Sequence, residues 1–254
     1  MKTSLSLFLA LGLFATTLDA KPASKTVSRT VTYKSGGEDV SAYLAMPEAK
    51  GKYPAVIMIH EWWGLNDWVK QMADALAAEG YVVLAVDLYR GKVTTSPQDA
   101  QALMNGTPKD RVATDLKSAY AYLETLEEAK GQKVGSVGWC MGGSYSLLAA
   151  RELGEKISAS VICYGRVSQD KAELSSVKAS VLGIFGGKDR GIPVEGVQAF
   201  EKELKAAGRD VELKIYENAG HAFMNPNNKA GYIEADAKDA WARTLAFFKK
   251  TLKG

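Results

Sequence analysis

The sequence predicts an α/β fold in which a mostly parallel sheet of eight strands is flanked by helices on both faces. Short apolar runs alternate along the chain with segments of helical spacing, and this βαβ rhythm produces parallel sheets. The 254 residues, 46% of them apolar and 24% charged, are enough for one full-sized core. We therefore expect one domain over residues 21–254.

The predicted strands begin with a hairpin whose β-forming segments, Val27–Tyr33 and Val40–Met46, flank the turn Ser35-Gly36-Gly37. Continuous apolar runs follow, as expected for strands that are buried on both faces of a parallel sheet. Two such runs are Ala55–His60 and Tyr81–Asp87. Further strands are predicted at Lys133–Gly138, at Ala159–Tyr164, within Val181–Asp189, which ends in a glycine-rich loop, and at Val211–Tyr216.

The predicted helices lie between these strands and carry apolar residues at helical spacing. They are Asn66–Glu79, Ala113–Leu126, Gly143–Leu153, Val194–Ala206 and Ile233–Lys250. The segment from Tyr89 to Arg111 is interrupted by Pro97, Gly106 and Pro108, so we expect a loop and a short helix there, over the functional site.

Residues 1–20 have the pattern of a secretory signal peptide, with Lys2 before an apolar run from Leu5 to Phe14 and small or polar residues up to Ala20. A membrane-anchoring helix is the weaker alternative, because a span needs roughly 20 apolar residues. We expect cleavage after Ala20 or Thr17, a periplasmic or secreted protein, and no stable membrane association afterwards.

The formal charge of +3 is spread along the chain without a Lys/Arg block, which argues against a nucleic-acid partner. No pattern specifies an oligomeric state. The chain has only two cysteines, Cys140 and Cys163, whereas a secreted disulfide scaffold carries several. Cys163 lies in an apolar strand and is predicted to be a buried apolar residue, with a disulfide to Cys140 as the alternative.

The stretch Gly135–Gly143, GSVGWCMGG, holds the predicted nucleophile. Its spacing, Gly138-x-Cys140-x-Gly142, is that of the sharp strand-to-helix turn of α/β-hydrolases. The two glycines permit close backbone approach and a strained conformation at Cys140. The helix start directs free N–H groups at the sulfur, which favours a negative charge there.

The predicted base is His221, in a loop just after the last strand, where the carboxyl end of the sheet places functional groups. The other histidine, His60, ends an apolar strand, and we expect it to have a structural role. The oxyanion hole is predicted to consist of the backbone N–H groups of Met141 and Trp62, which follow the nucleophile and the third strand.

The predicted acid is Asp189, in a loop after a strand and between Cys140 and His221 in the chain. This matches the order nucleophile, acid, base of α/β-hydrolases. Capping of the next helix is the alternative role for Asp189. Asp170 and Asp210 are less well placed.

Five motifs together resemble one family. They are His60-Glu61-Trp62-Trp63-Gly64-Leu65-Asn66, Asp87-Leu88-Tyr89, Gly138-Trp139-Cys140-Met141-Gly142-Gly143, Gly187-Lys188-Asp189 and Gly220-His221-Ala222-Phe223. From about Val27 to Leu252, the chain resembles the dienelactone hydrolases (carboxymethylenebutenolidases), which are α/β-hydrolases with a Cys-Asp-His triad. The resemblance implies that Glu61 contacts the resting thiol and shifts when substrate binds, so that the thiolate forms. A solvated Glu61 at a strand end is the alternative.

The resemblance also implies a substrate whose carboxylate is held by two arginines. In the family, one of these arginines lies soon after the Asp-Leu-Tyr motif, and Arg90 stands one residue away from that position. The other lies four residues after the catalytic histidine, where this chain has Asn225. Arg166 or Lys92 would then compensate, unless both are surface charges. Four aromatic residues are expected either to line an apolar pocket or to belong to the core: Trp62, Trp63, Tyr89 and Phe223.

These observations predict an exported hydrolase of a small-molecule carboxylic ester or lactone that uses no cofactor or metal. Cys140 attacks the carbonyl, and water releases the acyl-enzyme. Two alternatives from other classes are a non-catalytic binding protein on the same fold and a redox-active thiol protein that uses Cys140 and Cys163.

Overall fold

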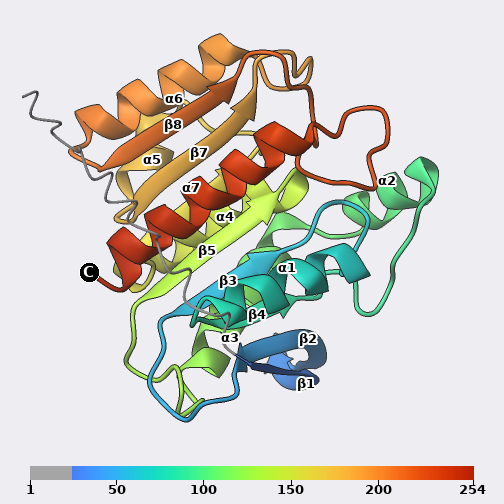
Figure 1. Cartoon of the computed structure of the whole chain (residues 1–254), viewed down its shortest axis with the longest axis vertical. Helices are drawn as coiled ribbons and strands as arrows, with labels where there is room; N and C mark the ends of the chain where they lie inside the picture. Colours follow the sequence, from blue (N-terminus) through green and yellow to red (C-terminus); the bar gives the residue numbers. More distant parts are fainter. Residues whose placement is uncertain (1–24) are drawn as a thin grey trace, which may run out of the picture.

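The computed structural model describes residues 25–254 (Figure 1). The signal peptide expected over residues 1–20 lies outside them. Within residues 25–254, no helix has both the length and the apolar character needed to cross a membrane.

The described chain forms one eight-stranded sheet in the order β1-β2-β4-β3-β5-β6-β7-β8 (Figure 1). The first hairpin is antiparallel, and β2 runs antiparallel to β4, whereas all later pairs are parallel. The predicted mostly parallel sheet is therefore confirmed. Its strands are β1 (Thr26–Ser35), β2 (Glu38–Pro47), β3 (Ala55–Ile59), β4 (Val82–Val86), β5 (Val134–Trp139), β6 (Ala159–Cys163), β7 (Ser180–Gly186) and β8 (Val211–Tyr216).

Helices cover both faces of the sheet, with α1 and α7 on one face and α3 and α4 on the other (Figure 1). The α-helices are α1 (Asp67–Ala78), α2 (Pro97–Asn105), α3 (Lys109–Leu123), α4 (Met141–Leu153), α5 (Lys171–Ser175), α6 (Val194–Ala206) and α7 (Glu234–Leu252). A single 3₁₀ turn, Gly154–Lys156, follows α4. Helix α4 begins two residues earlier than predicted, because Cys140 itself is its N-cap residue.

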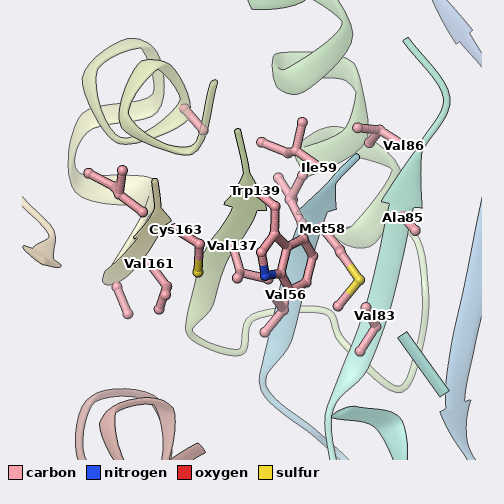
Figure 2. Close-up of a cluster of buried hydrophobic side chains, with 14 of the residues drawn as sticks. Val56, Met58, Ile59, Val83, Ala85, Val86, Val137, Trp139, Val161 and Cys163 are labelled. Carbon is pink, nitrogen blue, oxygen red and sulfur yellow. The ribbon is translucent and has the colours of Figure 1, made fainter. Parts of the chain in front are cut away.

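The core lies where the central strands meet the helices. Figure 2 shows side chains from β3, β4, β5 and β6 packed around the buried indole of Trp139. This ring makes an edge contact with Trp68 of α1, with centroids 5.2 Å apart. Every residue of β3, β4, β5 and β6 is buried. The result is a rigid platform whose carboxyl edge fixes the loops that carry Glu61, Cys140 and Tyr164.

Candidate active site

The nucleophile elbow follows β5 directly. Cys140 has φ 54° and ψ −118°, a left-handed conformation that non-glycine residues rarely adopt. Its N–H donates to the carbonyl oxygen of Cys163 on the neighbouring strand, at 3.0 Å. Since strained backbone persists only where the surroundings enforce it, this conformation marks a constrained position at the end of the strand.

Two glycines make the elbow sterically possible. A Cβ on Gly138 would collide with the carbonyl group of Gly142, and a Cβ on Gly142 would collide with the carbonyl oxygens of Ile59 and His60. The backbones of β3, β5 and α4 therefore meet at one point. This contact brings the loop after β3, with Glu61 and Trp62, next to the nucleophile.

Cys140, His221 and Asp189 form a continuous hydrogen-bonded chain. The Sγ atom of Cys140 lies 3.0 Å from Nε2 of His221, and Nδ1 of the same ring lies 2.6 Å from Oδ2 of Asp189. The Asp189 side chain is almost fully buried, while the His221 ring is partly open to the cleft. The Gly191 N–H donates to Oδ1 of Asp189 at 2.9 Å, which fixes the carboxylate. The three residues thus come together from the loops that follow β5, β7 and β8.

The contacts between these side chains shift the pKa values of His221 and Asp189 in opposite directions. Burial alone would lower the pKa of His221, but hydrogen bonds and charge interactions with Asp189 and Cys140 raise it to about 10. Burial would likewise raise the pKa of Asp189, but the hydrogen bond and charge of His221 bring it below its ordinary value. A protonated imidazole ring beside the Asp189 carboxylate is therefore favoured at neutral pH.

The residues expected to form the oxyanion hole both line the cleft beside Cys140. Met141 is the first residue of α4, and an amide in the first turn has no acceptor within its own helix. Trp62 follows β3 in the loop that the glycine contact holds against α4. The pairing of these two N–H groups as an oxyanion hole stays a prediction.

The Glu61 carboxylate is buried, with both oxygens hydrogen-bonded. Oε2 accepts from Nδ2 of Asn225 at 2.5 Å, and Oε1 accepts from the hydroxyl of Tyr164 at 3.4 Å. Burial raises the pKa of Glu61 to about 7, although the two hydrogen bonds and the charge of His221 lower it in part. The alternative of a solvated Glu61 is wrong, since the residue is 1% exposed. The sulfur of Cys140 has His221 as its hydrogen-bond partner, so the resting contact implied by the resemblance differs from the observed arrangement.

Of the two residues expected at the substrate, Asn225 lines the cleft and Arg90 does not. Asn225 is buried beside Glu61, and its Oδ1 accepts from the backbone N–H of Asn227 at 2.9 Å. Arg90 points toward the hairpin side of the sheet, where it forms two hydrogen bonds, of 2.8 and 3.0 Å, with the buried carboxylate of Asp115. Arg90 does not line the cleft. The expectation that Arg90 holds the substrate is therefore wrong for this structure, because a buried carboxylate binds its guanidinium group instead.

The cleft above Cys140 has a volume of about 1640 Å³. Trp62 and Trp63 line it, with ring centroids 4.8 Å apart. Tyr89 and Phe223 are instead core residues, the first hydrogen-bonded to the sulfur of Met141 and the second packed on Tyr164. The expected short helix over the site is α2, which contributes Gln101 and Met104 to the lining; other lining residues include Arg166, Lys188, Arg190 and Lys229.

The remaining predictions concern His60 and Cys163. His60 is fully buried; its Nε2 accepts from the Leu88 N–H at 3.2 Å, which agrees with the structural role. Cys163 is buried, and both cysteines are free thiols. Sequence reasoning missed Tyr164, which has a φ of 37° and whose ring lies edge-on to the ring of His221. A signal was present, since the Tyr164-Gly165 pair ends a buried strand next to the elbow.

A family model described as "Dienelactone hydrolase family" matches residues 40–252. The chain belongs to this family. Protein usf of Aquifex pyrophilus is 34% identical over 232 residues, covering 89% of this chain and 100% of that protein. A protein of Aquifex aeolicus with the provisional name carboxymethylenebutenolidase is 31% identical over 233 residues, with the same coverage. A crystal structure from Klebsiella pneumoniae, provisionally described as a dienelactone hydrolase, superposes with a TM-score of 0.81 at 28% identity, over 89% of this chain and 100% of the other.

Family membership and the eight-stranded fold identify this dienelactone hydrolase family member as a carboxylic ester or lactone hydrolase. The resemblance inferred from the five motifs and the predicted fold are therefore both confirmed.

Proposed function

We propose that this dienelactone hydrolase family member cleaves its ester or lactone with a Cys140–His221–Asp189 triad, through an acyl-enzyme. The observation that carries the proposal is the hydrogen-bonded chain from Sγ through both ring nitrogens of His221 to the Asp189 carboxylate. A nucleophile within hydrogen-bond distance of a base that a third group orients is the recurring arrangement of acyl-transfer enzymes.

In the first step, the Cys140 thiol gives its proton to Nε2 of His221, the sulfur attacks the carbonyl carbon, and the carbonyl oxygen takes up the negative charge. The N–H groups of Met141 and Trp62 donate to this oxyanion. When the intermediate collapses, the bond from the acyl carbon to the alkoxy oxygen breaks, and His221 gives its Nε2 proton to the leaving oxygen. Asp189 holds the ring in the required orientation throughout.

In the second step, water attacks the thioester and gives a proton to His221. The bond from the acyl carbon to Sγ breaks, Sγ takes the proton from Nε2, and the carboxylic acid leaves. Both steps use the same oxyanion site.

The size and lining of the cleft support a substrate with an apolar part. Trp62 and Trp63 offer flat apolar surface beside the nucleophile, and Met104 of α2 faces the same space. Turnover of p-nitrophenyl esters and of dienelactone by the wild type, Cys140→Ala and His221→Ala tests the proposal. We expect both variants to lose activity, while the buried Cys163→Ala control retains it. Activity that survives in both variants would exclude the triad.

We also propose that the protein is exported, on the charge and hydropathy pattern of residues 1–20. Fractionation of cells that express the full chain, with sequencing of the mature N-terminus, tests this. A start after Ala20 or Thr17 in the periplasmic or secreted fraction supports export, whereas an intact N-terminus in the cytosolic fraction excludes it.

A further inference from the structure

His60 follows β3 and precedes Glu61 and Trp62, and both nitrogens of its buried ring have backbone partners. Nδ1 lies 2.5 Å from the carbonyl oxygen of Glu61, and Nε2 lies 3.2 Å from the backbone nitrogen of Leu88. A carbonyl oxygen only accepts and an amide N–H only donates, so Nδ1 carries the proton and Nε2 is the acceptor. Burial lowers the pKa of His60, which agrees with this neutral ring.

The bond to Glu61 fixes the orientation of a peptide group. The Glu61 carbonyl and the Trp62 N–H belong to the same peptide unit, which is planar and trans, since no cis peptide bond occurs within residues 25–254. The N–H therefore points away from the carbonyl oxygen. That oxygen accepts from His60 and also from the N–H of Gly64, at 3.3 Å. Holding the oxygen in this way sets the direction in which the Trp62 N–H points.

The Trp62 N–H is free to bind a ligand. Over the described part of the chain, neither this group nor the Met141 N–H has a hydrogen-bond acceptor. Both residues line the cleft beside Cys140. The loop of Trp62 is held against α4, because Gly142 leaves no room for a side chain next to the carbonyl oxygen of His60. Two N–H donors without partners at the cleft are what the proposed acyl transfer requires.

The loop after β4 supports the His60 ring from its other side. Leu88 donates to Nε2, and the ring of Tyr89 makes an edge contact with the imidazole, with centroids 4.9 Å apart. The Tyr89 hydroxyl donates to the sulfur of Met141 at 3.2 Å. One loop therefore contacts Met141 directly and reaches the Trp62 peptide through His60.

We propose that His60 is a positioning residue of the oxyanion hole: its Nδ1–H holds the Glu61 carbonyl so that the Trp62 N–H donates to the substrate's carbonyl oxygen as this oxygen takes up negative charge. The inference rests on the proposed acyl-transfer function. His60 keeps its Nδ1 proton throughout, and the ring exchanges no proton with the substrate. The bond to Glu61 carries this role, whereas the bond to Leu88 holds the ring in place.

Two variants at position 60 separate these bonds. His60→Asn places its Nδ2 amide near the position of the ring Nδ1, so it still donates to the Glu61 carbonyl but does not reach Leu88. His60→Leu has neither bond. Both variants lose buried hydrogen bonds and should be less stable than the wild type. Thr244→Val, which loses a buried hydroxyl group on α7, is the control for stability alone.

The measurement is the acylation rate of the full mature chain, followed as p-nitrophenol release in a single turnover of p-nitrophenyl acetate. We expect His60→Leu to acylate on the order of 10²-fold more slowly than the wild type, as after loss of one oxyanion donor, and His60→Asn to stay within about threefold. Thr244→Val should acylate at the wild-type rate. If His60→Leu does not fold, His60→Phe replaces it, because it also lacks both nitrogens but keeps a ring against Tyr89.

A second reaction shows whether the nucleophile itself is intact. Cys140 attacks a sulfur atom of dithiodipyridine, so no oxyanion forms in this reaction. His60→Leu should react with dithiodipyridine within about twofold of the wild-type rate, although its acylation is slow. A merely structural role of His60 would slow both reactions together.

A wild-type acylation rate in folded His60→Leu would overturn the proposal. So would a loss in His60→Asn as large as that in His60→Leu, or an equal loss in the reaction with dithiodipyridine. Cys140→Ala separates these results from a failure of the proposed function. If Cys140→Ala releases p-nitrophenol at the wild-type rate, the triad is excluded and this inference falls with it. If release depends on Cys140 but His60→Leu acylates normally, the triad stands and this inference alone fails.

Discussion

The Sγ atom of Cys140 lies 3.0 Å from Nε2 of His221, although 81 residues separate them in the chain. The contact exists because β5 and β8 end at the same edge of one parallel sheet, and each places a short loop there. Asp189, after the intervening strand β7, completes the chain from the third loop.

Asp189→Asn should reduce kcat/KM by about 10²- to 10⁴-fold, because the amide no longer favours the charged ring and supports the wrong tautomer. The same change removes a hydrogen bond and a negative charge that raise the pKa of His221 to about 10. The pKa of His221 should therefore move down in the variant. NMR titration of the ring together with steady-state kinetics checks both expectations, and an unchanged His221 titration would contradict the assigned contact.

Glu61 should make the folded protein less stable as pH rises through neutrality. Its native pKa of about 7 lies above the ordinary 4.5, so the folded state binds this proton more tightly than the unfolded state. The resulting stability is complete below pH 4.5 and is lost as pH rises through 7. Between these two pKa values the folded state binds one more proton than the unfolded state, so the free energy of unfolding falls by about 1.4 kcal/mol per pH unit. The total loss is on the order of 3 kcal/mol.

Glu61→Gln removes this titration while keeping a side chain of similar size. As pH rises from 5 to 8, the wild type should therefore lose unfolding free energy that the variant keeps, and the variant should become the more stable of the two by a growing margin. Urea denaturation at several pH values measures it. A difference independent of pH would contradict the buried, proton-binding carboxylate.

Gly138→Ala should destabilise the fold by about 3 kcal/mol and lower Tm by about 6–12 °C, because the added methyl group collides with the carbonyl group of Gly142. Gly131→Ala is the matched control. Gly131 has a φ of +71° but open space around its Cβ, so only the backbone strain of roughly 1 kcal/mol applies. Calorimetry of both proteins tests the close approach, and equal losses of Tm would contradict it.

Arg90→Gln should lower stability without changing substrate preference. The Asp115 carboxylate, 3% exposed, loses its bidentate partner, at a cost of about 3 kcal/mol. Since Arg90 does not line the cleft, the ratio of kcat/KM for anionic and neutral esters of similar size should remain as in the wild type. A selective rise in KM for the anionic ester would place Arg90 at the substrate after all.

The strands, the elbow and the triad loops were predictable because their signals are local. Continuous apolar runs specify buried strands, and glycines at fixed offsets around Cys140 specify the turn. Helix α5 was not predicted, since its five residues are too short to show a helical period. The sequence also could not predict where long polar side chains point. Arg90 binds Asp115, and Asn225 binds Glu61 across 164 residues, because of contacts that only the folded sheet creates.

The covalent state of Cys140 during turnover tests the central claim most directly. The wild-type protein, quenched in acid within the first turnovers of p-nitrophenyl acetate, should carry one acetyl group on the Cys140 peptide, and Cys140→Ala should carry none and release no p-nitrophenol above background. Acetylation of another residue during turnover, or turnover by Cys140→Ala at the wild-type rate, would contradict the account.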